Sequence, residues 1–196
     1  MSRRRMSGAD RRAQLLDIAR EIVAADGYAT LSIERVASQS GVTRTVVYQQ
    51  FTDLAGLTTA LLDRESAIAF AGMGTVDQPD LDPEQLGRGI LDYLHAAPTS
   101  WRIILRPPEG APAEVRERIE LGRAYARKVS ARHLAAAAGV DLDADGTTVR
   151  ILLSAIEELA RLHLEDPHGH PDEEVLTYLR SLVGWAVGTA RETTAG

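Results

Sequence analysis

Residues 41–51 read Gly41-Val42-Thr43-Arg44-Thr45-Val46-Val47-Tyr48-Gln49-Gln50-Phe51. The glycine favours a sharp turn, and the residues after it suit a short helix with one apolar and one polar side. A helix this short is not stable alone in water, because its nucleation costs more free energy than a few hydrogen bonds return. We therefore expect neighbouring helices to hold it, with its polar residues facing outward. Those residues are Thr43, Arg44, Thr45 and Gln49. These residue types contact phosphates and base edges in complexes with DNA.

The preceding segments predict two helices that supply this support. Apolar residues with the i, i+3, i+4, i+7 spacing of one helix face are Leu15, Ile18, Ala19 and Ile22. Gly27 is a natural stop for that helix, Ser32 is a candidate N-cap for a second short helix, and Thr43 can cap the third. A long helix, a short helix, a tight turn and a short helix form the order of a helix-turn-helix. Such motifs place their second helix in the major groove of DNA.

At these residues the chain resembles the tetracycline-repressor (TetR) family of bacterial transcription regulators. The resemblance extends from about Arg11 to Leu62, and its most specific elements are Gly27-Tyr28, Gly41-Val42, Tyr48 and Phe51. It implies an all-α fold of about nine helices. Residues 1–52 would form an N-terminal arm and a helix-turn-helix domain, and residues 53–196 a helical ligand-binding and dimerisation domain. The resemblance also implies a repressor that binds a near-palindromic operator in double-stranded DNA as a homodimer and is released by a small-molecule effector.

The remaining sequence predicts further helices separated by proline- and glycine-containing breaks. Their expected ranges are 53–71, 83–96, 99–105, 113–138, 147–165 and 172–191. We expect Asp53 to cap the first of them. The segment from 72 to 82 is expected to be a loop. No internal repeat and no strand-like alternation interrupts this all-helical pattern.

Candidate DNA-contacting residues lie in the N-terminal arm, at the start of the second helix and on the third helix. They are Arg3, Arg4, Arg5, Ser32, Arg35, Thr43, Arg44, Thr45, Val46, Tyr48 and Gln49. The planar fork of Arg44 suits guanine O6 and N7, while the resemblance assigns Thr43 and Tyr48 to phosphate oxygens. The arginine arm either follows the minor groove or is a solvated tail. The alternative for Tyr48 is a core aromatic residue whose hydroxyl merely reaches water.

The charge distribution agrees with a DNA-binding N-terminal domain, although the 196-residue chain carries a net charge of −6. Residues 1–52 hold eight Arg and five Asp or Glu, for a net charge of +3, while the remainder holds fourteen Arg or Lys and twenty-three Asp or Glu, for −9. The local field governs the encounter with phosphate. There is no cysteine, no apolar run long enough to span a bilayer and no signal-peptide pattern, so we expect a soluble cytoplasmic protein.

Two apolar sets in the C-terminal part are candidates for effector binding and dimerisation. Candidate walls of a ligand pocket are Tyr93, Trp101, Ile104, Leu105, Tyr125, Val129 and Leu153. Candidate dimer-interface residues on the last two helices are Leu152, Ile156, Leu159, Leu179, Leu182 and Trp185. For both sets the alternative is ordinary monomer core. The pocket set favours an apolar or aromatic effector.

Two other classes of function are alternatives to a regulator. The segment from His163 to His170 is dense in metal-ligand types, but it lacks a known zinc spacing, so we expect a solvated loop and no metal. No nucleophilic triad, phosphate-binding glycine loop or nucleotide fingerprint is present, so we expect no catalytic residue and no cofactor. The alternatives are an all-helical protein-interaction module and a metal-dependent enzyme without DNA binding.

Overall fold

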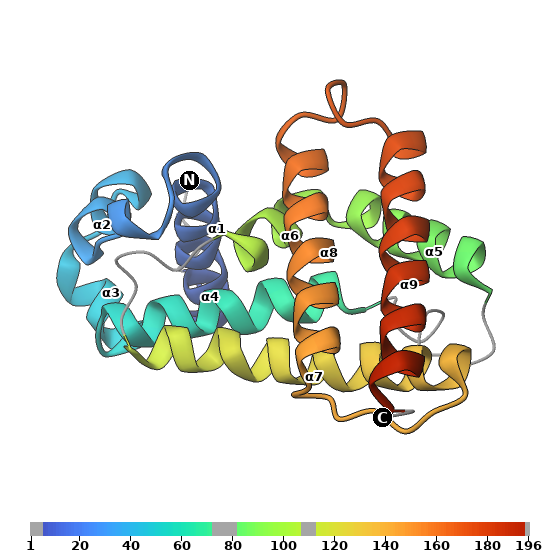
Figure 1. Cartoon of the computed structure of the whole chain (residues 1–196). Coiled ribbons are helices and arrows are strands. Elements are labelled where there is room, and N and C mark those ends of the chain that lie inside the picture. The colour runs from blue at the N-terminus through green and yellow to red at the C-terminus, as the bar shows by residue number, and fades with distance from the viewer. Residues whose placement is uncertain (1–5, 72–81, 107–112, 195–196) are drawn as a thin grey trace.

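The computed structural model describes residues 6–71, 82–106 and 113–194. Across these ranges the fold consists of nine α-helices and one short 3₁₀ turn, with no strand. The predicted all-α class and helix number are therefore confirmed. Figure 1 shows the first three helices gathered at one end of the molecule, with α8 and α9 at the other.

The N-terminal unit has the predicted order of helices. Its elements are α1 (Gly8–Asp26), the 3₁₀ turn η1 (Tyr28–Thr30), α2 (Ile33–Ser40) and α3 (Arg44–Phe51). Gly27 ends α1 with a φ of 86°, and Gly41 ends α2 in the left-handed region with a φ of 67°. The hydroxyl of Ser32 caps α2 by accepting a hydrogen bond from the Arg35 amide at 3.1 Å. Thr43 holds the N-cap position of α3, but its hydroxyl makes no capping hydrogen bond, so that part of the prediction was wrong.

The rest of the chain forms a larger helical assembly. Its helices are α4 (Leu54–Ala69), α5 (Pro83–Ala96), α6 (Pro98–Leu105), α7 (Ala113–Ala138), α8 (Thr147–Glu165) and α9 (Asp172–Thr194). Asp53 caps α4 as predicted, because its carboxylate accepts from the Gly56 amide at 2.7 Å. Helices α4 and α7 run side by side away from the N-terminal unit, and α8 and α9 pack against each other across α7 (Figure 1). The loop predicted from 72 to 82 lies outside the described residues except for its last residue.

The buried core of the N-terminal unit continues into the larger assembly. Leu57 and Leu61 on α4, Ile103 on α6 and Val115 on α7 are fully buried in the same apolar cluster as α1, α2 and α3. Burying each such side chain contributes roughly 1.5–3 kcal/mol. The boundary predicted at residue 52 therefore coincides with a turn between helices, while apolar packing is continuous across it. The division into two domains stays a prediction.

No helix among the described residues is both long enough and apolar enough to cross a membrane.

Candidate nucleic-acid interface and ligand cavity

The outer side of α3 carries the polar residues that the sequence placed there. Thr43, Arg44, Thr45 and Gln49 are exposed, and Val46 is half-buried. Tyr48 is also turned outward, with 50% of its surface exposed, which excludes the alternative of a core aromatic residue. Hydroxyl, guanidinium, amide and methyl groups thus lie together on one short helix. This combination suits contact with phosphates and with base edges.

The inner side of α3 is fixed by packing and by one arginine. Val47 and Phe51 are buried. The guanidinium of Arg12, on α1, lies over the Phe51 ring at 4.4 Å from its centroid and donates a hydrogen bond to the Gln50 carbonyl. A cation over an aromatic face contributes about 0.5–1 kcal/mol at a partly exposed site. These contacts hold α3 against α1 with its polar side chains facing outward.

The other candidate DNA contacts have partners within the protein or lie outside the described residues. Arg35 forms an ion pair with Asp26, and the hydroxyl of Ser32 accepts from the Arg35 amide, so both groups already stabilise the start of α2. Both side chains remain partly accessible. The basic arm Arg3, Arg4 and Arg5 lies outside the described residues.

A cavity of about 720 Å³ lies between α4, α5, α6, α7, α8 and α9. All seven residues proposed from the sequence line it: Tyr93, Trp101, Ile104, Leu105, Tyr125, Val129 and Leu153. Tyr125 and Leu121 are exposed as well as cavity-lining, so they lie where the cavity opens to solvent. Its volume falls in the range of sites for small organic molecules.

A few polar groups interrupt the apolar cavity wall. The hydroxyl of Tyr93 is buried and has no hydrogen-bond partner among the described residues. The indole N–H of Trp101 donates to the Tyr93 carbonyl at 3.0 Å, which fixes the ring as part of the wall. Glu157 pairs with Arg123 at 3.3 Å. Burial raises the pKa of the Glu157 carboxyl, while the Arg123 guanidinium lowers it. The cavity wall is therefore mostly apolar and carries the Glu157–Arg123 ion pair, while the Tyr93 hydroxyl is buried behind the wall surface.

A buried carboxylate connects the N-terminal unit to the cavity wall, and sequence reasoning missed it. Glu65 on α4 is fully buried and pairs with Arg20 of α1 at 3.1 Å and with Arg64 at 2.9 Å. The Ser100 hydroxyl, on α6, donates to the same carboxylate at 2.7 Å. A buried carboxylate requires partners of this kind. The signal in the sequence was only a glutamate at an apolar position of α4, next to Leu61 and Leu62.

Helix α6 is bound to the N-terminal unit at two further points. The hydroxyl of Tyr28 donates to the Ile103 carbonyl at 2.8 Å, and Arg106, just after α6, donates to the Val23 carbonyl at 3.0 Å. Trp101, Ile104 and Leu105, which line the cavity, are also on α6. This single helix thus contacts both the cavity and the helices that support α3.

The predicted dimer surface needs correction. Leu152, Leu159 and Leu179 are buried within the protomer, because α8 and α9 turn these residues toward the rest of the chain. Ile156 and Leu182 are half-buried against the same clusters, and Trp185 is exposed. The outward apolar side of the two helices instead consists of Ile151, Tyr178 and Trp185.

Comparison with known proteins is consistent with this arrangement. Residues 15–61, which include α2 and α3, match the family model described as bacterial regulatory proteins, tetR family. An uncharacterised HTH-type transcriptional regulator of Mycobacterium tuberculosis is 25% identical over 182 residues, covering 90% of this chain and 76% of that protein.

Solved structures share the whole fold at low sequence identity. A TetR-like transcriptional regulator from Rhodococcus sp. RHA1 has a TM-score of 0.68 and 18% identity, covering 94% of this chain and 99% of that chain. The structure of the SmeT–triclosan complex has a TM-score of 0.59 and 17% identity, with 91% and 90% coverage. These likenesses extend over the cavity-forming helices as well as the helix-turn-helix.

Proposed function

Because the chain belongs to the TetR family of bacterial regulatory proteins, we propose that this transcriptional regulator is a ligand-responsive repressor. In this proposal the protein acts in the cytoplasm, where its dimer binds a near-palindromic DNA operator. A small molecule that binds in the cavity releases the dimer from the operator. The observation that carries the proposal is the exposed polar side of α3. The opposite side of this helix is packed through Val47 and Phe51 and contacts Arg12 of α1. Neither an interaction module nor a metal-dependent enzyme is favoured by these features.

Within α3 the roles divide by chemistry. Arg44 is proposed to read a guanine, with Thr45 and Val46 placing methyl groups against thymine methyls and Gln49 contacting a base or a phosphate. Thr43 and Tyr48 are proposed to bind phosphate oxygens, which position the helix without reading sequence. Ser32 and Arg35 at the start of α2 would add phosphate contacts beside their interactions within the protein.

The effector is proposed to be a largely apolar, aromatic-containing molecule with one group that hydrogen-bonds to Tyr93. The apolar walls favour such a molecule, and the buried hydroxyl of Tyr93 requires a partner that the described residues do not supply. The likeness to a protein solved with triclosan adds support for this class of ligand.

Release of DNA is proposed to proceed through α6. An effector that contacts Trp101, Ile104 or Leu105 favours one position of this helix, and α6 is hydrogen-bonded to the support of α3 through Ser100 and Ile103. The effector must bind the two arrangements with different affinity, since equal affinity shifts no equilibrium. Two subunits would change the separation of their α3 helices together.

The dimer interface is proposed on the outward side of α8 and α9. Ile151, Tyr178 and Trp185 are exposed there, and a Cβ added at Gly184 or Gly188 would meet no neighbouring atom of the chain. Small and apolar residues at one surface allow helices of a second subunit to approach closely. A two-fold axis through this surface would give an operator with two related half-sites.

Selection of genomic fragments by the purified protein tests the proposed function. We expect enrichment of fragments that share a near-palindromic motif with half-sites about one DNA turn, or a multiple, apart. The same selection with Arg44→Ala should lose the motif, whereas Lys128→Ala, which removes one exposed positive charge from α7, should retain it. Recovery of the same unrelated fragments by all three proteins would contradict sequence-specific binding through α3.

A further inference from the structure

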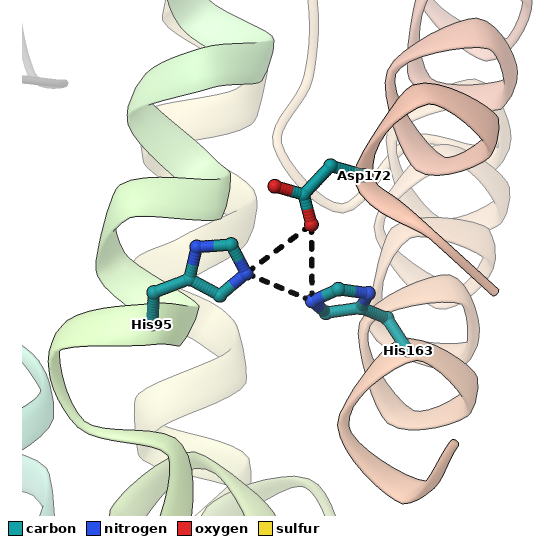
Figure 2. Close-up of side chains that lie close together, drawn as sticks. All are labelled: His95, His163 and Asp172. Carbon is teal, nitrogen blue, oxygen red and sulfur yellow. Dashed lines mark hydrogen bonds and ion pairs between the residues drawn. The ribbon is translucent and has the colours of Figure 1, made fainter. Parts of the chain in front are cut away.

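Two histidines and an aspartate from three helices point toward one another (Figure 2). His95 comes from the last turn of α5, His163 from the last turn of α8 and Asp172 from the start of α9. The Nε2 atoms of the two histidines are 3.0 Å apart. The Oδ1 atom of Asp172 lies 3.3 Å from Nε2 of His95 and 3.7 Å from Nε2 of His163.

The buried histidine is fixed with its free nitrogen toward the other two groups. Only 3% of the His163 side chain is exposed, and its Nδ1 lies 2.8 Å from the His170 carbonyl oxygen. A carbonyl accepts but does not donate, so Nδ1 carries the proton and Nε2 of the neutral ring has a lone pair. A backbone carbonyl that orients the second ring nitrogen is the usual companion of a metal-ligating histidine.

The three facing atoms have few protons to share among them. When both imidazoles are neutral and the Asp172 carboxylate is ionised, the triangle holds at most one proton, on Nε2 of His95. It can be donated to one of the two acceptors at a time. Electron-rich atoms that converge in this way are stabilised by a cation placed between them.

The spacing of the three atoms matches a tetrahedral metal site. With metal–nitrogen and metal–oxygen distances near 2.0–2.2 Å, two ligand atoms of a tetrahedron are about 3.3 Å apart. The observed edges of 3.0, 3.3 and 3.7 Å lie around that value. Two imidazoles and one carboxylate suit zinc and its first-row neighbours, whereas Mg²⁺ and Ca²⁺ prefer sites made of oxygen atoms.

We propose that His95, His163 and Asp172 bind one divalent transition-metal ion of the Zn²⁺ type. The solvent-exposed side chains of His95 (46%) and Asp172 (54%) provide an entry path and leave a fourth position for water. This site departs from the sequence expectation of no metal. It does not use the histidine-rich turn as a unit, because only His163 of that segment donates a side-chain ligand, and His168 is exposed outside the triangle.

Metal binding would fasten one wall of the cavity to the outer helices. Helix α5 contributes Gly87, Ile90 and Tyr93 to the cavity, and His95 lies two residues beyond Tyr93. A bound ion joins the end of α5 to the ends of α8 and α9 through direct bonds. The ion therefore stabilises the folded protein whether or not the proposed repressor function is correct.

The test uses the full-length protein, freed of any histidine tag and of metal, titrated separately with Zn²⁺ and Co²⁺. We expect one ion per chain, a thermal midpoint that rises to saturation with Zn²⁺, and the ligand-field absorption of four-coordinate Co²⁺. His95→Ala and Asp172→Asn change exposed side chains, so they preserve the fold, and each should weaken binding at least ~10–100-fold. His168→Ala is the matched control, since it removes an exposed imidazole from the adjacent turn.

Retention of stoichiometric binding in both His95→Ala and Asp172→Asn would overturn the proposal. Loss of binding in His168→Ala with normal binding in His95→Ala would also overturn it, because the turn itself would then hold the ion. The absence of any saturable shift in the wild-type thermal midpoint would show that the triangle is only a hydrogen-bonded cluster. Circular dichroism of each metal-free variant checks that the helices are intact.

Discussion

The Ser100 hydroxyl donates a 2.7 Å hydrogen bond to the Glu65 carboxylate, and both side chains are fully buried. The bond joins α6, which lines the cavity, to α4, and the same carboxylate is paired with Arg20 of α1. A buried charge with this set of partners tolerates little displacement of any one of them. A shift of α6 on effector binding would therefore displace the partners of Glu65, including Arg20 on α1, the helix that supports α3.

Glu65→Gln should lower the free energy of unfolding by about 1–3 kcal/mol, because it removes the charge that pairs with Arg20 and Arg64. The two guanidiniums remain partly solvated, which keeps the cost below that of an isolated buried charge. Chemical denaturation measures the change. Asp63→Asn is the control: it breaks the exposed Asp63–Arg118 pair and should cost about 0–1 kcal/mol. Equal effects of the two substitutions would contradict a special role for Glu65.

Tyr28 should make the protein less stable at high pH. Burial raises the pKa of its hydroxyl above the ordinary value. Above pH ~10 the unfolded chain loses this proton while the folded chain keeps it, so the free energy of unfolding falls as pH rises, by at most about 1.4 kcal/mol per pH unit. Tyr28→Phe loses the hydrogen bond to Ile103 and should cost about 0.5–1.5 kcal/mol at pH 7. Denaturation curves at pH 7 and 11 should show that the stability difference between the wild type and Tyr28→Phe becomes smaller at pH 11. A difference that is the same at both pH values would contradict a raised pKa for the Tyr28 hydroxyl.

Tyr93→Phe should leave the protein as stable as the wild type or more stable, by up to about 1 kcal/mol, because it removes a buried hydroxyl without a partner among the described residues. Thermal unfolding measures this effect. Tyr125→Phe, at the exposed opening of the cavity, is the control and should change stability by less than about 0.5 kcal/mol. A clear destabilisation by Tyr93→Phe would show that the hydroxyl is already satisfied, and it would remove the reason for assigning it to an effector.

Tyr48→Phe should weaken DNA binding by a similar factor on matched and unmatched duplexes. Loss of one phosphate hydrogen bond costs about 0.5–1.5 kcal/mol, or roughly 2- to 10-fold in affinity. Fluorescence anisotropy with a selected fragment and with a shuffled fragment gives the two dissociation constants. Tyr125→Phe, equally exposed but on α7, should match the wild type when no effector is added. A loss confined to the matched duplex would instead assign Tyr48 to base reading.

Much of the fold followed from local signals in the sequence. Gly27, Ser32 and Gly41 mark helix ends through backbone conformation and capping, which depend on a few neighbouring residues. The seven candidate cavity residues also line the cavity, because large apolar and aromatic residues are more often buried than exposed. The rule has exceptions here, since Tyr178 and Trp185 on α9 are exposed. Whether the cavity residues bind an effector is a separate question that the cavity alone leaves as a proposal.

Features that depend on contacts between residues distant in the sequence could not be predicted from local patterns. Helical periodicity indicated that Leu152, Leu159 and Leu179 are buried, but burial within one chain and burial between two chains give the same pattern. The pairing of His95 with His163 joins residues 68 apart in the sequence. The partners of Glu65 likewise come from three helices, and no spacing along the chain reports them.

The most direct test of whether α3 reads DNA is the ratio of two affinities, one for a selected fragment and one for a shuffled duplex. This ratio is measured at moderate salt for the wild type, Arg44→Ala and Lys128→Ala. The wild type and Lys128→Ala should share a high ratio, whereas Arg44→Ala should bind the selected fragment about 1–3 kcal/mol more weakly and lose most of its preference. A ratio near one for the wild type, or an unchanged high ratio for Arg44→Ala, would contradict base recognition by this helix.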